Sequence, residues 1–409
     1  MLPERGSSRP AGPKPAPDVP VAFVILLTAL VMVGQMSTSM YLPSLPSLAG
    51  DLGADPGSVK LTMTVFLVAF GVAQLVFGPV SDRFGRRPAL FLGLGLYVAG
   101  TGICALAPTV GWLIVGRFVQ GFGACAGPAV ARAVVRDRFD RSEAARILAA
   151  IGMAMAVGPA VGPMIGGLLQ TLFGWRANFL ALAAFGLAVW AAAAWALRES
   201  LLSGDPDAIK PVQLLRNYAL LLRNRVYLGN MLATAFLFGG LFSYATGIPF
   251  VLIDLLGMSP SAFGGVFIFT VAGSLAGSTI ASRAAGRVPV ERMVAIGGSV
   301  ALLGGTAMLT TTLTGFVNPA TIVGSMMIVM IGFGITTPNA LAGAMAPFPA
   351  IAGTASALLG FAQMAVAAAG SVGVAALFDG TARPMAAVIF AMGAGAVLSL
   401  ALLRRPART

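Results

Sequence analysis

Runs of about twenty or more apolar residues alternate with short polar segments along most of the chain. A helix of about 20 apolar residues is as long as the bilayer core is thick, so each run predicts a membrane-spanning helix. The fold class that we expect is therefore all-α integral membrane, and the first run is too long for the core of a signal peptide. The pattern predicts twelve spans, at 19–42, 58–79, 88–107, 110–135, 144–170, 175–197, 226–253, 260–282, 290–313, 319–341, 350–377 and 382–403.

The longest internal connection, which contains Pro206 and Pro211, divides the twelve spans into two sets of six. The start of the chain is rich in Pro, Ser and Gly and is expected to be disordered. The expected organisation is a cytoplasmic tail, a first six-helix bundle, a cytoplasmic linker, a second six-helix bundle and a short second tail, at 1–18, 19–197, 198–225, 226–403 and 404–409 respectively.

Composition agrees with a lipid environment and excludes several kinds of site. Hydrophobic residues make up 57% and charged residues 10%, against about 45–50% and 25% in soluble domains. There is no histidine, and Cys104 and Cys125 both lie in apolar runs. We therefore expect no metal, no cofactor and no enzyme active site.

The distribution of basic residues predicts the orientation. If both termini are cytoplasmic, 22 of the 26 Lys and Arg lie at cytoplasmic segments, and only Lys60, Arg176 and Arg383 lie on the other side. This asymmetry is the positive-inside pattern of a multi-pass inner-membrane protein. The net charge of +12 is thereby explained without a nucleic-acid partner.

The most specific motif follows the second span. Its two glycines permit a tight turn, and it holds one acid among several arginines. A simpler interpretation is a short loop that obeys the positive-inside rule. A weaker copy without the acid, from Gly277 to Arg287, follows the eighth span and indicates a duplicated bundle. The motif positions are Gly78, Asp82, Arg83, Gly85, Arg86 and Arg87.

This loop resembles the conserved loop of the major facilitator superfamily. The resemblance implies two pseudo-symmetric six-helix bundles around a central cavity that opens alternately to each side. It also implies a gating role for the six motif positions, in which Asp82 holds the outward-facing state through the start of the eleventh span, near Gly353 and Thr354.

The fourth span contains Arg117, Gln120 and Gly121, which spacings of three and four place on one helix face. They resemble the span-four motif that the superfamily's drug exporters use for proton coupling. The alternative is an arginine near the end of a span whose side chain extends outward to the membrane interface.

The fifth span carries glycines at a spacing of four, which lets another helix approach closely, and two prolines that permit bending. The Gly-Pro pairs resemble the motif of drug antiporters within the superfamily, whereas the alternative is ordinary packing of small residues. These positions are Gly158, Pro159, Gly162, Pro163, Gly166 and Gly167.

Stretches at 37–46 and 338–360 look like the bicyclomycin/chloramphenicol-resistance type of drug:proton antiporter, with one departure. Ser39 occupies the position where that type usually has an aspartate. None of the fourteen acidic residues lies clearly at mid-membrane, so proton coupling is implied by the resemblance alone. Asp82 is the nearest candidate for a proton site.

Aromatic, methionine and polar side chains within the spans are candidates for a substrate cavity. Each could instead pack against a neighbouring helix or face lipid. The candidates are Gln35, Met36, Ser39, Tyr41, Asn230, Phe236, Phe238, Phe242, Tyr244, Phe269, Asn339, Gln363 and Met364.

We expect a monomeric secondary active transporter that exports small amphipathic drugs, either phenicol- or bicyclomycin-like compounds or lipophilic cations, in exchange for protons. One alternative is an exporter or uniporter of a native metabolite such as a sugar or amino acid, without proton coupling. A second is a membrane receptor or scaffold that does not transport.

Overall fold

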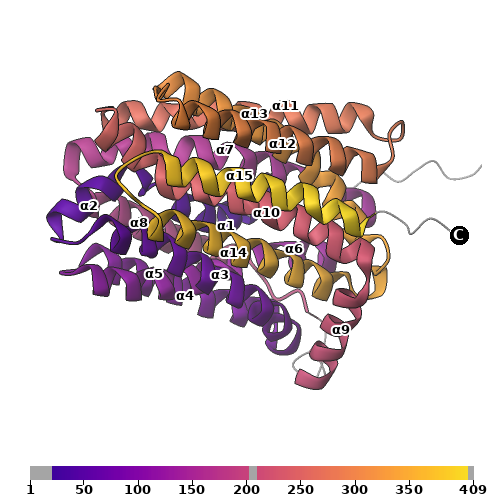
Figure 1. The fold of residues 1–409 in the computed structure, drawn as a ribbon. Coiled ribbons are helices and arrows are strands. Elements are labelled where there is room, and N and C mark those ends of the chain that lie inside the picture. Colours follow the sequence, from indigo (N-terminus) through magenta and orange to yellow (C-terminus); the bar gives the residue numbers. More distant parts are fainter. Residues whose placement is uncertain (1–20, 202–209, 404–409) are drawn as a thin grey trace, which may run out of the picture.

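A computed structural model describes residues 21–201 and 210–403 (Figure 1). Within them, twelve helices are long and apolar enough to cross a membrane, which confirms the predicted fold class. The predicted tails at 1–18 and 404–409 lie outside the described residues.

The first six spans begin with α1 (Val21–Ser39), which continues through η1 (Leu42–Ser44) into α2 (Leu45–Asp51). Pro43 and Pro46 lie in the first turns of η1 and α2, where a proline N–H is not needed, so neither interrupts the chain's helical course. The predicted first span ended earlier, at 42. The other helices of this half are α3 (Pro56–Phe84), α4 (Arg86–Ala105), α5 (Val110–Ala124), α6 (Ala126–Arg138), α7 (Arg141–Phe173) and α8 (Arg176–Ala196).

Six further spans follow in the second half. Helix α10 and the π-helical turn η2 together form the first of them, and α5 and α6 together form one span of the first half. The helices of the second half are α10 (Arg225–Pro249), η2 (Phe250–Leu255), α11 (Pro260–Ala284), α12 (Val290–Leu313), α13 (Pro319–Met345), η3 (Pro349–Ile351), α14 (Ala352–Ala376), α15 (Arg383–Leu398) and η4 (Ser399–Leu402).

The predicted linker contains a helix that the sequence analysis did not anticipate, α9 (Pro211–Arg223). Its first residue is a proline, which suits a helix start. Tyr218 and Leu221 on α9 pack with Tyr227 of α10 and Leu358 of α14, so the linker helix lies against the second half.

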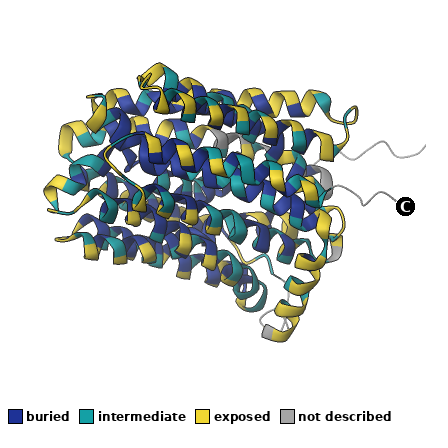
Figure 2. Cartoon of the chain, viewed as in Figure 1, coloured by how far each residue is buried: buried dark blue, intermediate teal, exposed yellow. Residues whose placement is uncertain are grey.

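The spans alternate in direction, so the bundle has two ends (Figure 1). We call them the α2 end and the α9 end after the short helices that they carry. Buried positions lie between the helices and exposed positions around the outside (Figure 2). Many exposed side chains are large and apolar, such as Leu92 and Leu303, as contact with lipid requires. The most extensive contacts between the halves join α3 to α14 and α7 to α11.

Candidate functional site

A large cavity opens at the α9 end, between the two halves. Its volume is about 1090 Å³, and helices α3, α4, α6, α9, α13 and α14 contribute to its lining. Polar side chains from both halves face it, among them Gln74, Asp82 and Arg132 from the first half and Ser356 from the second. A cavity of this size holds a small organic molecule.

At the α2 end, the halves are in direct contact. Thr64 on α3 donates a hydrogen bond of 2.8 Å to Ser371 on α14, and Ser371 is 2.9 Å from the hydroxyl of Thr246 on α10. Closer to the α9 end along α3, a Cβ added to Gly71 would lie 2.9 Å from Cβ of Met364 on α14. No charged side chain takes part in these contacts.

Lys60 is a buried cation at this closed end. Its side chain is 0% exposed, and its ammonium lies 2.9 Å from the ring centroid of Phe378 and 4.1 Å from that of Phe250. The ammonium has no hydrogen-bond partner among the described residues. Two aromatic faces from the second half therefore hold a cation from the first half.

A second contact between the halves joins the motif helix α7 to α11. Gly167 lies against the backbone of Pro260, and a Cβ there would overlap the carbonyl oxygen of that proline. Gly264 on α11 in turn lies against the backbone of Pro163. Small residues on both helices allow the two backbones to approach closely.

The glycine stripe of α7 faces α1. A Cβ added to Gly158 would meet Met32 and Gln35, one at Gly162 would overlap the hydroxyl of Ser39, and one at Gly166 would overlap the carbonyl oxygen of Met40. The stripe therefore joins α1 to α7 within one half. Inside α7, Pro159 and Pro163 break the ladder of helix hydrogen bonds.

The loop between α3 and α4 is a single turn residue flanked by ion pairs. Gly85 has φ of 105°, a conformation that glycine adopts without strain. Arg86 is 3% exposed and pairs with Asp82 four residues earlier and, at 2.8 Å, with Asp137 on α6. Arg83 is on the last turn of α3, and Arg87 donates a hydrogen bond of 3.1 Å to the carbonyl oxygen of Ala194.

Glu199 completes this cluster from just beyond α8. Its carboxylate accepts hydrogen bonds of 3.0 Å from the backbone N–H groups of both Arg86 and Arg87, and so caps the start of α4. Burial raises the pKa of Glu199, but the hydrogen bonds from Leu201, Arg87, Arg86 and Ser200 outweigh it and leave the pKa below its ordinary value.

The structure places Asp82 and the start of α14 in the same cavity without joining them. Gly353 and Thr354 line the cavity together with Gly78 and Asp82. The hydrogen bond of Asp82, however, goes to Arg86. The expected contact of Asp82 with the start of α14 is therefore absent from this conformation, in which the α9 end is open.

Arg117 is fully buried, so the alternative of a side chain that extends to the interface is wrong. Its guanidinium lies 4.2 Å from the ring centroids of both Tyr41 and Phe66. One nitrogen donates hydrogen bonds to the carbonyl oxygen of Ser37, at 2.9 Å, and to Oε1 of Gln120, at 2.6 Å. The stacked cation and its polar partners fix the arginine inside the first half.

Two neighbours extend the surroundings of Arg117. Gln120 donates a hydrogen bond of 3.0 Å to Thr101, while Ser37 donates one of 2.9 Å to Tyr97. Gly121 lies against α3, where a Cβ would be 2.6 Å from the carbonyl oxygen of Phe66. The span-four motif is thus an internal polar network and not part of the lining of the large cavity.

The candidate substrate residues are dispersed. None is among the residues that line the cavity at the α9 end. Gln35, Met36, Ser39 and Tyr41 lie on or just after α1, and Tyr41 is fully buried. Ser39 donates a hydrogen bond of 2.8 Å to the carbonyl oxygen of Gln35 and fills the space beside α7.

In the second half, most of these residues serve helix packing. Asn230 and Asn339 each donate a hydrogen bond to a carbonyl oxygen of their own helix. Phe236 packs against Gly395 of α15, and the ring of Phe238 contacts that of Phe333 on α13 at a tilt of 57°. Phe269 is 54% exposed. The remaining four are half-buried or buried on α10 and α14: Phe242, Tyr244, Gln363 and Met364.

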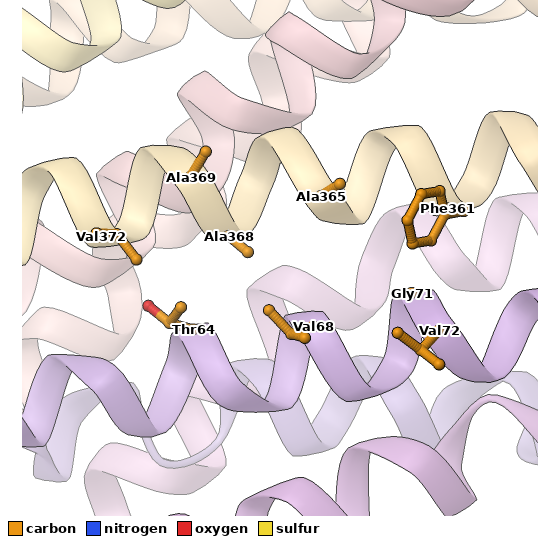
Figure 3. A pocket seen from close by; sticks show the side chains of 9 residues that line it. All are labelled: Thr64, Val68, Gly71, Val72, Phe361, Ala365, Ala368, Ala369 and Val372. Atoms are coloured by element: carbon orange, nitrogen blue, oxygen red, sulfur yellow. The ribbon is translucent and has the colours of Figure 1, made fainter.

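A second hollow, of about 380 Å³, lies between α3 and α14 (Figure 3). Its lining is apolar apart from Thr64, and it includes Val68, Val72, Phe361 and Val372. No charged side chain lines it, so it cannot orient a charged ligand.

Several of these features were not identified from the sequence. Lys60 was identified only as a basic residue outside the cytoplasmic segments, and Glu199 only as one of the fourteen acidic residues of the chain. The signal for Lys60 was its position as the third residue of the predicted span 58–79, where a lone cation needs partners. Nothing in the spacing of Glu199 predicts a contact with a turn more than a hundred residues earlier.

Comparison with known proteins gives consistent matches over most of the chain. The model of a family described as the Major Facilitator Superfamily matches residues 27–371. The uncharacterized MFS-type transporter YdgK of Bacillus subtilis is 34% identical over 373 residues, which cover 90% of this chain and 92% of the relative. The bicyclomycin resistance protein homolog of Haemophilus influenzae is 31% identical over 384 residues, which cover 92% of this chain and 94% of the relative. Multidrug resistance protein D of Escherichia coli is 31% identical over 345 residues, which cover 83% of this chain and 85% of the relative.

Solved structures share the fold at low identity. The crystal structure of a D-xylose-proton symporter has a TM-score of 0.74 at 16% identity and covers 94% of this chain and 97% of its own. The peptide transporter POT in complex with alafosfalin also has a TM-score of 0.74, at 18% identity, and covers 94% and 93%. These likenesses show the fold, and the family model and the relatives above 30% identity show the family. The chain belongs to the major facilitator superfamily, as its loop motif predicted.

Proposed function

We propose that this chain is a secondary active exporter that moves small amphipathic drugs out of the bacterial cytoplasm in exchange for protons, as a monomer in the inner membrane. Relatives over most of its length are named for resistance to bicyclomycin and to multiple drugs. The excess of Lys and Arg supports cytoplasmic termini and a cytoplasmic α9 end.

The observation that carries this proposal is the contrast between the two ends of the bundle. The halves enclose a cavity of about 1090 Å³ at the α9 end. At the α2 end, Thr64, Ser371 and Lys60 join them. A molecule could enter from the cytoplasm and could not leave on the other side, which is one of the two states that alternating access requires.

The loop around Asp82 supports a gate on the cytoplasmic side. In the present state, Asp82 is held by Arg86, whose second carboxylate partner is Asp137. Closure of the α9 end would bring the start of α14 towards Asp82, whose charge would favour the positive end of that helix. Protonation of Asp82 would weaken this contact and reopen the cavity to the cytoplasm.

Drug accumulation in cells that lack their own efflux pumps tests the proposal. A mixed panel of phenicols, bicyclomycin and lipophilic cations would be measured with and without a protonophore. We expect lower accumulation of at least one compound, restored by the protonophore. Lower accumulation that the protonophore leaves unchanged would indicate transport without proton coupling. Unchanged accumulation of every compound would reject drug export in favour of a specific metabolite or a protein that does not transport.

A further inference from the structure

The charges that line the cavity at the α9 end do not balance. Asp82 is the one carboxylate among the lining residues, and it is already paired with Arg86. Arg86 also holds Asp137, so that cluster contributes no positive charge to the cavity. Two other charged lining residues, Arg132 and Arg136, are both basic and both lie on α6.

The positive charges of Arg132 and Arg136 are the ones that no carboxylate among the lining residues balances. They are four residues apart on α6, so they lie on one face of that helix. Both side chains are exposed and both line the cavity. The structure gives neither of them a carboxylate partner among the residues that it describes. Two adjacent guanidinium groups repel each other unless an anion lies between or beside them.

The start of α14 adds a third positive feature at the same place. Ala352, Gly353 and Thr354 line the cavity, and no side chain caps this helix start. Its first N–H groups carry a partial positive charge. A Cβ added at Gly353 would lie 3.8 Å from Nη1 of Arg136, so the guanidinium reaches the helix start. An anion at this point would relieve the repulsion and accept hydrogen bonds from both.

The rest of the lining suits an apolar body. Leu214, Leu341, Met345 and Ile351 contribute apolar surface to the same cavity. Resting on the proposed export function, we propose that this cavity binds small organic anions, in which a carboxylate or phosphate group meets Arg132, Arg136 and the start of α14.

A matched pair of ligands separates this inference from general drug binding. Chloramphenicol is neutral, and chloramphenicol succinate adds a carboxylate to the same body. Equilibrium binding of both to the purified full chain in detergent would be measured for the wild type and for the double variant Arg132→Gln/Arg136→Gln. We expect the affinity for the succinate to fall about tenfold or more, while the affinity for chloramphenicol stays the same.

Two further variants control for charge and folding. Arg132→Lys/Arg136→Lys keeps both positive charges and should retain most of the succinate binding. Arg283→Gln/Arg287→Gln removes two exposed arginines with the same spacing at the same end of the second half, and should bind both ligands as the wild type does. Equal succinate affinity in the wild type and the first double variant would overturn the inference, as would a wild type that binds only chloramphenicol.

The source of the anion is tested by adding phosphatidylglycerol or phosphatidylcholine to the same assay. If phosphatidylglycerol alone displaces the succinate, the site holds a lipid headgroup and the substrate assignment fails. The two proposals can fail separately. If the anion binds through the two arginines but the protein lowers the accumulation of no drug, the anion site stands and the export proposal is rejected. If the protein exports a drug but the anion does not bind through the arginines, the export proposal stands and the anion site is rejected.

Discussion

The ammonium of Lys60 lies 2.9 Å from the ring centroid of Phe378, although the two residues belong to different halves of the transporter. A second ring, that of Phe250, lies 4.1 Å away. The cation is fully buried and has no hydrogen-bond partner among the described residues, so the two aromatic faces and the attraction of the nearby carboxylates of Asp254 and Asp55 stabilise it. These contacts exist only while the α2 end is closed, so they favour the state that is open to the cytoplasm.

Lys60→Met should therefore shift the protein towards the state that is open at the α2 end. Methionine keeps the apolar stem and removes the charge, and a cation–π contact of about 0.5–2 kcal/mol corresponds to a shift of about two- to thirtyfold in the ratio of states. The measurement is the distance distribution between spin labels at Leu106→Cys and Phe316→Cys, two exposed positions at the α2 end, with Cys104 and Cys125 replaced.

Arg383→Met is the control for Lys60→Met. Arg383 is a basic residue at the same end but is exposed. The substitution Arg383→Met should therefore leave the distance distribution between the spin labels unchanged. If Lys60→Met and Arg383→Met give the same distribution as the wild type, the buried lysine does not act as a latch.

Glu199→Gln should lower the stability of the protein by about 1 kcal/mol, the usual contribution of a helix cap. The carboxylate caps the start of α4 through the N–H groups of Arg86 and Arg87. Because the folded protein lowers the pKa of Glu199, this stabilisation is present above the unfolded pKa of about 4.3 and is lost as pH falls through the lower folded pKa.

Thermal unfolding in detergent from pH 7 down to pH 3 checks the role of Glu199. The difference in Tm between the wild type and Glu199→Gln should be largest at pH 7 and should shrink below about pH 4. Asp51→Asn, at an exposed acid of the α2 end, serves as the control and should show no such trend. A difference in Tm that stays constant over the whole range would show that the charge of Glu199 is not what caps α4.

Arg117→Lys should reduce gradient-driven export about tenfold or more without preventing membrane insertion. Lysine keeps the charge but has no planar group that could stack on Tyr41 and Phe66 while donating hydrogen bonds to Ser37 and Gln120. Drug transport into inverted vesicles with an imposed proton gradient measures the effect. Export at the wild-type rate would remove Arg117 from the transport cycle and leave it a packing role.

Asp82→Asn should impair export while the protein remains inserted, because a neutral side chain cannot be attracted to the start of α14 when the cytoplasmic end closes. Asp137→Asn removes the other partner of Arg86. If pairing with Arg86 were all that mattered, the two variants would be equally impaired. We expect Asp82→Asn to reduce export severalfold more than Asp137→Asn, as measured by drug accumulation at matched expression.

The sequence was sufficient for the fold because hydrophobic length and charge bias are local signals. The twelve runs could be found without knowing any contact, although the first was predicted to end at 42 and continues to Asp51. Helix α9 was missed because its apolar face is too short to resemble a span. The candidate site was harder to predict. Whether Phe236 faces a cavity or packs against Gly395 depends on how the helix is rotated, and apolar residues occur on all sides of a buried span.

The environment of Ser39 shows the same limit. The sequence made it a candidate for the substrate cavity, at a position where the resembling type of antiporter usually has an aspartate. In the structure, Ser39 is 6% exposed and lies against Gly162 of α7. An aspartate there would have to displace α7 or turn away from it. The effect of the substitution therefore depends on the contact between α1 and α7, which the spacing of residues along the chain does not specify.

Gly166→Ala should be among the most damaging single-methyl changes in the α7 motif. The added Cβ would overlap the backbone carbonyl oxygen of Met40, just beyond the end of α1, and a backbone atom cannot move aside as a flexible side chain can. We expect a loss of about 1–3 kcal/mol of stability, as for other overpacked sites. Gly152→Ala lies on the same helix with nothing within 4 Å of the new methyl group. It should be neutral or stabilising by up to about 1 kcal/mol, because alanine favours helix more than glycine does. The Tm values of the two variants in detergent measure the difference. Equal Tm values would mean that α1 and α7 separate without cost, and would contradict the view that the glycine stripe exists to bring these two helices together.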